Sequence, residues 1–126
     1  MNVEWEVTYY SEKGGSIPIQ EYIDKLSLKE QAKTIAFIRL LEEKGPNLPR
    51  PYADFLEDGI HELRIRLTGT QVRILYFFCY QNIIVLTNVF DKHSVKVPKE
   101  QIKLAKENRR DFLDRYSEKD FREKKE

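Results

Sequence analysis

The fold of this 126-residue chain is decided by residues 60–90, which read IHELRIRLTGTQVRILYFFCYQNIIVLTNVF. Three apolar runs, 60–67, 71–79 and 83–90, follow one another here with only three residues between neighbours. Connections this short join neighbouring strands as hairpins. The stretch therefore predicts a three-stranded antiparallel meander.

A further strand is predicted close to the N-terminus. Apolar side chains alternate there with polar ones, which is the period-two pattern of a half-buried strand: Val3, Trp5, Val7 and Tyr9. Residues 47–52, before the meander, are interrupted by prolines and predict an extended loop. We place this loop inside the domain, because the strands after it need the elements before it for burial.

Two helices are predicted between the first strand and that loop. Pro18 opens a short helix to about residue 26, and Ser27 precedes a second helix with Glu30 at the spacing of a capping box. Gly45 and Pro46 end the second helix. We expect this helical hairpin to cover the sheet through the apolar residues of the second helix: Leu28, Ala32, Ile35, Ala36 and Leu40, with Phe37 and Leu41 beside them.

A basic amphipathic helix is predicted after Pro98, because apolar residues recur there at three-and-four spacing with Lys and Arg between them. Residues 117–126 are almost wholly charged and predict a flexible tail. Residues 1–116 have the length of one domain. The expected fold is α+β, with an N-terminal strand, a helical hairpin, a three-stranded antiparallel meander and a C-terminal helix.

The formal net charge of +1 conceals an uneven distribution. Residues 1–59 carry 7 Lys and Arg against 11 Asp and Glu, residues 60–110 carry 10 against 4, and residues 111–126 carry 5 against 6. A positive middle segment can form a patch that holds an RNA phosphate backbone. It can equally be a solvated face that the acidic N-terminal part neutralises, and composition leaves both readings open.

Several classes of protein are excluded or disfavoured. Cys79 is the only cysteine, so an intrachain disulfide and a thiolate metal cluster are excluded. The apolar runs are far shorter than the ~20 residues that span a bilayer. Glu4 and Glu6 stand where a signal peptide carries basic residues, so we expect a cytoplasmic protein. Glycine-rich phosphate loops and nucleophile-elbow motifs are absent from the sequence.

Three arginines lie within the predicted meander. Alternation along the first strand puts Glu62, Arg64 and Arg66 on one face. Arg73 stands between apolar neighbours in the next strand, so it must reach a carboxylate or line an open cleft. Glu62 is the obvious carboxylate. Arg73 is then either half of a stabilising ion pair or a guanidinium available to phosphate.

The end of the third predicted strand gathers titratable residues. Lys92, His93 and Lys96 follow Phe90 directly, and Lys99 follows Pro98. A histidine at such a corner can transfer a proton near neutral pH, and lysines can stabilise negative charge. The alternative interpretation is that His93 is an exposed loop histidine without a catalytic role. We interpret His61, at the start of a strand, as structural, and the two histidines form no recognisable metal site.

Three blocks of this sequence together resemble a known family. They are residues 59–65 (GIHELRI), residues 72–78 (VRILYFF) and the run from Ile84-Val85-Leu86 to FDKHS at 90–94 with Pro98 beyond it. Their content, order and spacing resemble the phage-derived, HigB-like branch of the RelE/ParE toxin superfamily. The resemblance extends from the first strand to about residue 112 and implies a compact RelE-like fold.

The resemblance implies a type II toxin that enters the ribosome and cleaves mRNA. It also implies a helix-turn-helix antitoxin as partner, in a homodimer or a toxin–antitoxin hetero-oligomer. Arg64 and Arg73 match the sheet arginines of the family, and Lys92 matches the first lysine of its turn. His93 stands where the second lysine usually is, and Asn88 where members often carry a histidine or a small residue.

The implied reaction is attack of a ribose 2′-OH on the adjacent phosphodiester, without metal or cofactor. We assign Arg64 and Arg73 to charge stabilisation, Lys92 to phosphate contact and His93 to proton transfer. Further RNA contacts are expected from Arg66, Lys96 and Lys99. Tyr76 and Phe90 are either core residues or aromatic rings that stack on an unpaired base.

Three other functions stay open. ParE-like relatives poison a topoisomerase without cutting RNA, and a degenerate homologue would only bind its antitoxin, because one fold carries several functions. A third reading is a nucleic-acid-binding domain that uses the C-terminal helix through Lys103, Lys106, Arg109 and Arg110.

Overall fold

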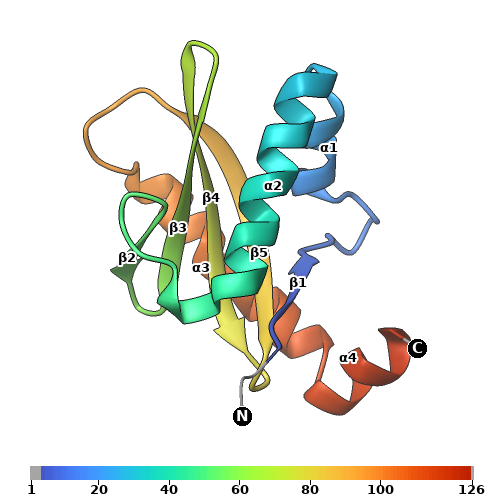
Figure 1. Ribbon diagram of the computed structural model, residues 1–126. Coiled ribbons are helices and arrows are strands. Elements are labelled where there is room, and N and C mark those ends of the chain that lie inside the picture. The colour runs from blue at the N-terminus through green and yellow to red at the C-terminus, as the bar shows by residue number, and fades with distance from the viewer. Residues whose placement is uncertain (1–3, 126) are drawn as a thin grey trace.

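Five strands form one mixed sheet in the computed structural model, which describes residues 4–125 (Figure 1). The sheet order is β1-β5-β4-β3-β2. The strands are β1 (Glu6–Tyr9), β2 (Ala53–Glu57), β3 (Ile60–Leu67), β4 (Thr70–Cys79) and β5 (Ile83–Lys92). The helices are α1 (Pro18–Asp24), α2 (Leu28–Lys44), α3 (Lys99–Arg115) and α4 (Glu118–Lys125), with a 3-10 turn at Gly45–Asn47. The α+β class is confirmed.

The meander has four strands, one more than the sequence predicted. β3, β4 and β5 pair antiparallel as expected, and β2 adds to the outer edge of β3. Asp58 and Gly59 form the connecting turn, with φ of 49° and 80°. An Asp-Gly pair favours such left-handed turns, so the sequence did contain the signal for this hairpin.

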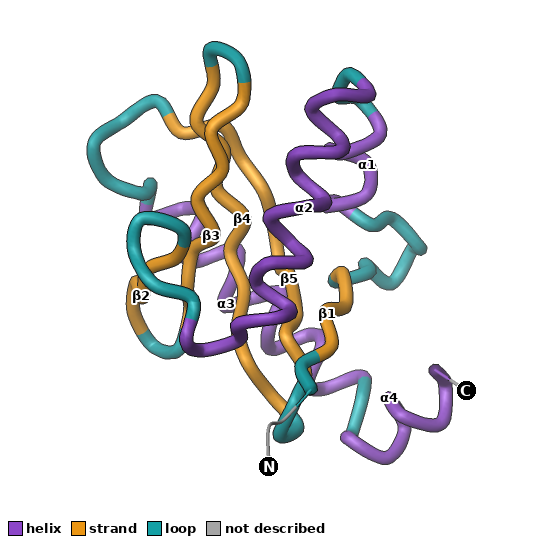
Figure 2. The backbone as a smooth tube through the Cα atoms, viewed as in Figure 1, coloured by secondary structure: helices purple, strands orange, loops and turns teal. Residues whose placement is uncertain are grey.

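The first strand makes the sheet mixed. β1 pairs parallel with β5, Glu6 standing opposite Ile83, so the meander supplies the edge on which β1 is added. The chain then crosses one face through α1 and α2 to reach β2 at the opposite edge (Figure 2). Val3, which the sequence included in this strand, lies outside the described residues.

Two apolar cores lie on the two faces of the sheet. One is closed by α1 and α2, and contains Ile19, Ile38, Leu41, Leu63 and Ile74 among others. The other is closed by α3, and contains Ile60, Leu75, Phe77, Val85 and Phe112. Alternation along the strands sends successive side chains to opposite cores.

The stripe through which helix α2 packs overlaps the predicted one only in part, since Leu41 is buried and Ile35, Phe37 and Leu40 pack against the core. The helix begins after Ser27, whose hydroxyl accepts a hydrogen bond from the Glu30 N–H, and ends at Gly45, as the sequence indicated. Its buried residues are Thr34, Ile38 and Leu41, whereas Leu28 is 84% exposed. Ala32 and Ala36 are exposed as well. The polar Thr34 is buried because the helix lies on the sheet along this stripe, which spacing alone does not reveal.

The C-terminal segment predicted to be flexible contains the helix α4. Its one aromatic residue, Phe121, is buried against Phe112 and Tyr80. Arg122 donates to the backbone oxygen of Tyr80 at 2.9 Å and to Asn82 Oδ1 at 2.7 Å. One aromatic anchor and one arginine thus dock a highly charged helix. Within residues 4–125, every helix is too short or too polar to cross a membrane.

Candidate functional site

Three rows of side chains cross β3, β4 and β5 on the face of the sheet that α3 covers. Residues opposite each other in neighbouring strands share a face, as do residues two apart in one strand. The outer row contains Arg66, Gln71 and Lys92. The middle row contains Arg64, Arg73 and Phe90. The inner row contains Glu62, Leu75 and Asn88. The strand register thus aligns Arg66 with Lys92 and puts Arg64 and Arg73 together in the neighbouring row.

The inner row is where α3 meets the sheet. Asn88 is 3% exposed, and its Nδ2 donates to the backbone oxygen of Gln101 at 3.2 Å and to Gln101 Oε1 at 3.0 Å. Its Oδ1 accepts from Thr87 Oγ1 at 2.6 Å. Asn88 therefore anchors the first turn of α3 to β5. The outer row lies two residues along the strands beyond the middle row and stays open.

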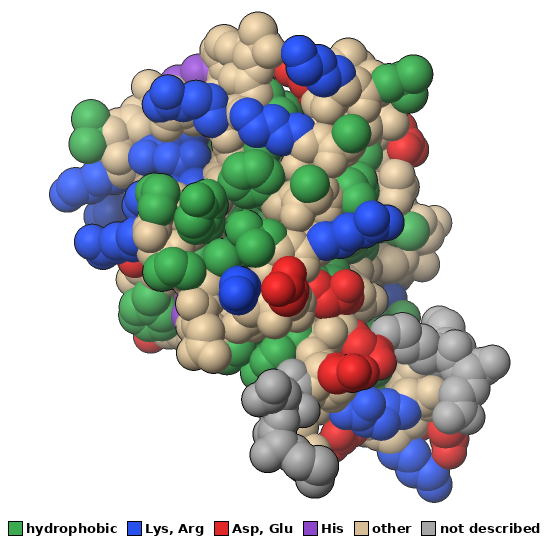
Figure 3. Space-filling view, in the orientation of Figure 1, with side chains coloured by type: hydrophobic (Ala, Val, Ile, Leu, Met, Phe, Trp, Pro, Cys, Tyr) green, Lys and Arg blue, Asp and Glu red, His purple; other side chains and the backbone are tan. Residues whose placement is uncertain are grey.

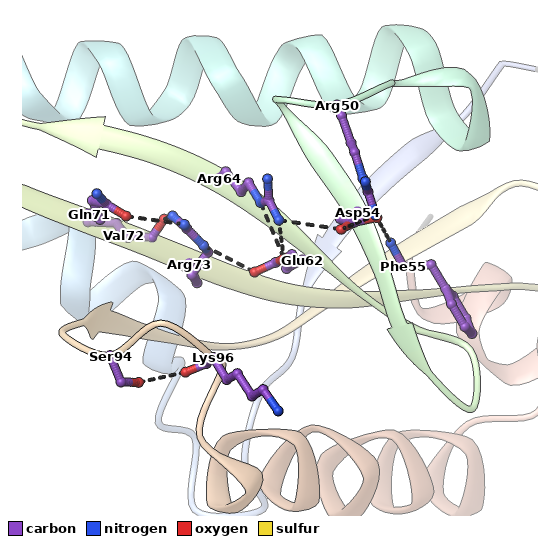
Figure 4. A network of polar contacts seen from close by, with 10 residues as sticks. All are labelled: Arg50, Asp54, Phe55, Glu62, Arg64, Gln71, Val72, Arg73, Ser94 and Lys96. Carbon is purple, nitrogen blue, oxygen red and sulfur yellow. Dashed lines mark hydrogen bonds and ion pairs between the residues drawn. The ribbon is translucent and has the colours of Figure 1, made fainter.

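Glu62 ties the two sheet arginines together (Figure 4). It is 2% exposed, and its Oε2 accepts from Arg64 Nε at 3.2 Å and Nη2 at 3.1 Å. Its Oε1 lies 3.1 Å from Arg73 Nε. Asp54 of β2 adds a second carboxylate, 3.3 Å from Arg64 and 3.0 Å from Arg50. The ion-pair reading of Arg73 and Glu62 is therefore the one that the structure adopts.

The Arg73 guanidinium is almost fully enclosed, with 7% of the residue exposed. Arg73 Nε and Glu62 Oε1 form an ion pair without the geometry of a hydrogen bond. Neither atom has a hydrogen-bond partner elsewhere among the described residues. The Nη atoms donate to the Val72 backbone oxygen and to Gln71 Oε1. Burial lowers the pKa of Arg73, and the charge of Glu62 opposes that shift. Arg73 is thus a fixed internal cation that also orients Gln71 of the outer row.

The outer row lines an open hollow of about 740 Å³ between the β3–β4 hairpin and the loop after β5. The cationic and titratable side chains that line it are Arg66, Lys92 and His93. Among the described residues none of the three has an ion-pair partner. In the loop, Ser94 Oγ donates to the backbone oxygen of Lys96 at 2.6 Å. The predicted corner of Lys92 and His93 therefore exists, and Arg66 completes it.

Positive charge is concentrated around this corner. Figure 3 shows Lys and Arg side chains gathered at the upper left of the molecule, where Figure 1 places the β3–β4 hairpin and the loop before α3. Lys96 and Lys99 are exposed in or next to that loop. α3 begins at Lys99, so the positive end of its dipole points towards the same region. These charges favour an anionic ligand here.

The cations further along α3 have other partners. Lys106 contacts Glu57 at 2.6 Å and Asp58 at 2.8 Å. Arg109 donates to the backbone oxygen of Asp58 and lies over the Phe77 ring, 6.0 Å from its centroid. Two of the four basic residues that the sequence suggested for nucleic-acid binding therefore hold α3 to the β2–β3 turn.

The two predicted stacking residues lie in different environments. Tyr76 is 2% exposed in the core beneath α1 and α2, on the opposite face from the site, so it is a core residue and is inaccessible to RNA. Phe90 is half-buried in the middle row, opposite Arg73. His61 is half-buried and stacked on Tyr76 with centroids 5.3 Å apart, and burial lowers its pKa. Its ring therefore packs among core aromatic residues, away from the outer row.

Two polar members of the site were missed from the sequence. Gln71 was read only as the first residue of a strand, and its place between Arg66 and Lys92 depends on the register of two hairpins. Asp54 was missed because β2 was missed, although the Asp58-Gly59 turn signalled that hairpin. Cys79 lies outside the site, and burial raises the pKa of its thiol to about 11, which disfavours the nucleophilic thiolate.

Residues 21–110, well over half of the chain, match the family described as phage derived protein Gp49-like (DUF891). The chain therefore belongs to this family, which is a RelE/HigB-like, toxin-type family. The matched region begins in α1 and ends in α3, so it includes all three rows of the site. No curated protein matches the chain.

Proposed function

We propose that this protein is the toxin of a toxin–antitoxin system and that it cleaves mRNA on the ribosome. The observation that carries the proposal is the outer row, where Arg66, Lys92 and His93 line one hollow without ion-pair partners among the described residues. Unpaired cations at an open corner suit a phosphate group, and membership of a toxin-type family supports the same reading.

The proposed reaction is a transesterification within the RNA strand. The ribose 2′-oxygen forms a bond to phosphorus as the bond to the 5′-oxygen breaks, leaving a 2′,3′-cyclic phosphate and a free 5′-hydroxyl. One group must take the proton of the 2′-OH and another must give a proton to the departing oxygen. His93 is proposed for proton transfer, because it is an exposed titratable side chain in the hollow.

The cations are proposed to have different roles, according to how exposed each one is. Lys92 and Arg66 are proposed to contact phosphate oxygens directly, with Lys96 and Lys99 holding the flanking strand. Arg64 keeps about a third of its side chain exposed and is proposed to stabilise the charged transition state. Arg73 is buried next to the outer row, where it is proposed to add positive charge near the phosphate and to orient Gln71. Glu62 is excluded as the base, because it is buried and bound by two arginines.

The test compares induced wild-type protein with His93→Gln and Lys92→Ala in cells. We expect wild type to stop translation and to create new mRNA 5′ ends, and His93→Gln to cleave about a hundredfold more slowly. Lys33→Ala, an exposed lysine on α2, is the matched control for Lys92→Ala. Unchanged translation without new ends, together with altered chromosome supercoiling, would replace the nuclease by a ParE-like topoisomerase poison.

The proposal includes an antitoxin as partner. Cells should tolerate the wild-type protein when the small helix-turn-helix frame expected beside its gene is expressed with it. Purification of a complex of the two proteins checks the partnership, and toxicity that persists despite co-expression would contradict it.

A further inference from the structure

A second groove adjoins the site where β2 stops pairing with β3. β2 begins at Ala53, which pairs with Leu63. Just before β2, the backbone oxygen of Tyr52 accepts a hydrogen bond from the Arg64 N–H at 2.8 Å. The groove has a volume of about 350 Å³, within the range of small-ligand sites. Its lining consists of Phe37, Pro51, Tyr52, Arg64, Ile65, Arg66, Gln71 and Arg73. Arg66 and Gln71 also line the hollow of the outer row, so the two depressions are neighbours that share these two side chains.

One wall of this groove is aromatic. Tyr52 is 41% exposed, and its ring centroid lies 6.2 Å from that of the half-buried Phe37. Phe37 therefore supports one side of Tyr52, while a large part of the Tyr52 ring stays accessible. Tyr52 precedes β2 in a turn that the Arg64 hydrogen bond fixes to the sheet.

The other wall is cationic. Arg64 and Arg73 are held by Glu62, whereas Arg66 is exposed and has no ion-pair partner among the described residues. An aromatic ring beside guanidinium groups is how single-stranded nucleic acid is commonly bound, with the base stacked on the ring and the phosphate paired with the cation.

Exposure alone does not distinguish Tyr52. Phe55 of β2 is more exposed, at 55%, but it contacts His61 and lines neither depression. What sets Tyr52 apart is its position in a groove that shares two residues with the proposed catalytic hollow. Phe55 therefore provides a matched control.

We propose that Tyr52, supported by Phe37, stacks on an unpaired base of single-stranded RNA whose phosphate contacts Arg66. The inference rests on the proposed function for its substrate class and assigns to Tyr52 the recognition of one nucleotide next to the site of cleavage. Tyr52 then acts in binding and takes no part in proton transfer.

The test uses a short oligouridine RNA that carries one 2-aminopurine, a base whose fluorescence is quenched by stacking. At low ionic strength, wild type should quench the probe on binding, and Tyr52→Phe should do the same. Tyr52→Ala should abolish the quenching and weaken binding about tenfold, the scale of one base–aromatic stack. Phe55→Ala should behave as wild type. A probe with an abasic site at the same position should bind wild type and Tyr52→Ala equally.

The outcomes separate this inference from the proposed cleavage. Equal losses for Tyr52→Ala and Phe55→Ala, or no quenching by wild type, overturn the stacking role whether or not mRNA is cut in cells. Quenching that depends on Tyr52, in a protein that leaves mRNA intact in cells, supports the stacking role and overturns the nuclease. Unfolding in urea shows whether each variant is folded. If Tyr52→Ala is unstable, the stacking role is still overturned by a folded Tyr52→Phe that keeps the ring but fails to quench the probe.

Discussion

The inner and outer rows of the site both contain charged residues, but the charges are buried in one row and open to water in the other. In the inner row, Glu62 is 2% exposed and neutralised by Arg64 and Arg73 of the next row. In the outer row, Arg66 and Lys92 line an open hollow, and neither has an ion-pair partner among the described residues. The two rows are only four residues apart along β3.

The difference follows from where α3 begins. The helix starts at Lys99 and covers the sheet from the inner row onwards, so charge in that row must be paired to be buried. The outer row lies beyond the helix and remains in water, where an unpaired cation costs little. Polar groups of one sheet face are thereby separated into a scaffold and a binding surface. Four changes test this separation.

The largest loss of stability is expected from Glu62→Gln. This change keeps the shape of the side chain but leaves two guanidinium groups without their buried counter-charge. We expect the free energy of unfolding in urea to fall by about 3 kcal/mol, the lower end for a broken buried ion pair, because Arg64 stays partly solvated. Glu57→Gln, at an exposed carboxylate paired with Lys106, should cost at most about 1 kcal/mol. Equal losses for the two variants would contradict a scaffold role for the inner row.

A smaller loss is expected from Asn88→Ala. The variant leaves the backbone oxygen and the side chain of Gln101 without their donor at the start of α3, and we expect a loss of about 1–2 kcal/mol. Hydrogen exchange in the first turn of α3 should accelerate more than exchange in β1. Asn47→Ala, at an exposed position, is the control. Unchanged exchange in α3 would show that the helix is held by other contacts.

A pH-dependent effect is expected at Asp54. Its contact with Arg50 is the main cause that lowers the pKa of Asp54 below its ordinary value of 3.8. A carboxylate whose folded pKa is depressed stabilises the fold above its unfolded pKa, and this stabilisation disappears as the pH falls through the folded pKa. The difference in unfolding free energy between wild type and Asp54→Asn should therefore narrow from neutral pH to pH values below about 4. A constant difference would mean that Asp54 contributes through its shape and not through its charge.

The smallest effect on stability is expected in the outer row. The double variant Arg66→Ala, Lys92→Ala should change the free energy of unfolding by no more than about 0.5 kcal/mol. Its binding to single-stranded RNA should weaken, and the slope of log K against log salt should shrink by about 1.4, since each cation paired with a phosphate of a single strand contributes about 0.7 to that slope. Lys29→Ala, Lys33→Ala removes the same charge from exposed positions on α2 and should leave the slope unchanged. Equal slopes for both double variants would show a non-specific effect of net charge.

Much of the fold could be predicted from local patterns in the sequence. Period-two alternation identified β1, β3 and the arginine face of the meander, and short connections identified its hairpins, because both depend only on neighbouring residues. The boundaries of α2 at Ser27 and Gly45 followed from capping chemistry. The errors were a missed strand, β2, and misjudged burial, since Thr34 is buried, Leu28 is exposed and Phe121 docks α4. Tyr76 is a core residue, one of the two alternatives that the sequence left open.

The sequence by itself determined which residue types are available. Arg64 and Arg66 lie on one strand face together with Glu62, and Lys92 and His93 lie at the end of the last strand of the meander. Tertiary structure decided which of these cations are neutralised and which are open to a ligand. That outcome depends on strand register and on the residue at which α3 begins to cover the sheet. The same guanidinium is scaffold or binding group according to the water and counter-charge around it, and both are set by residues distant in the chain.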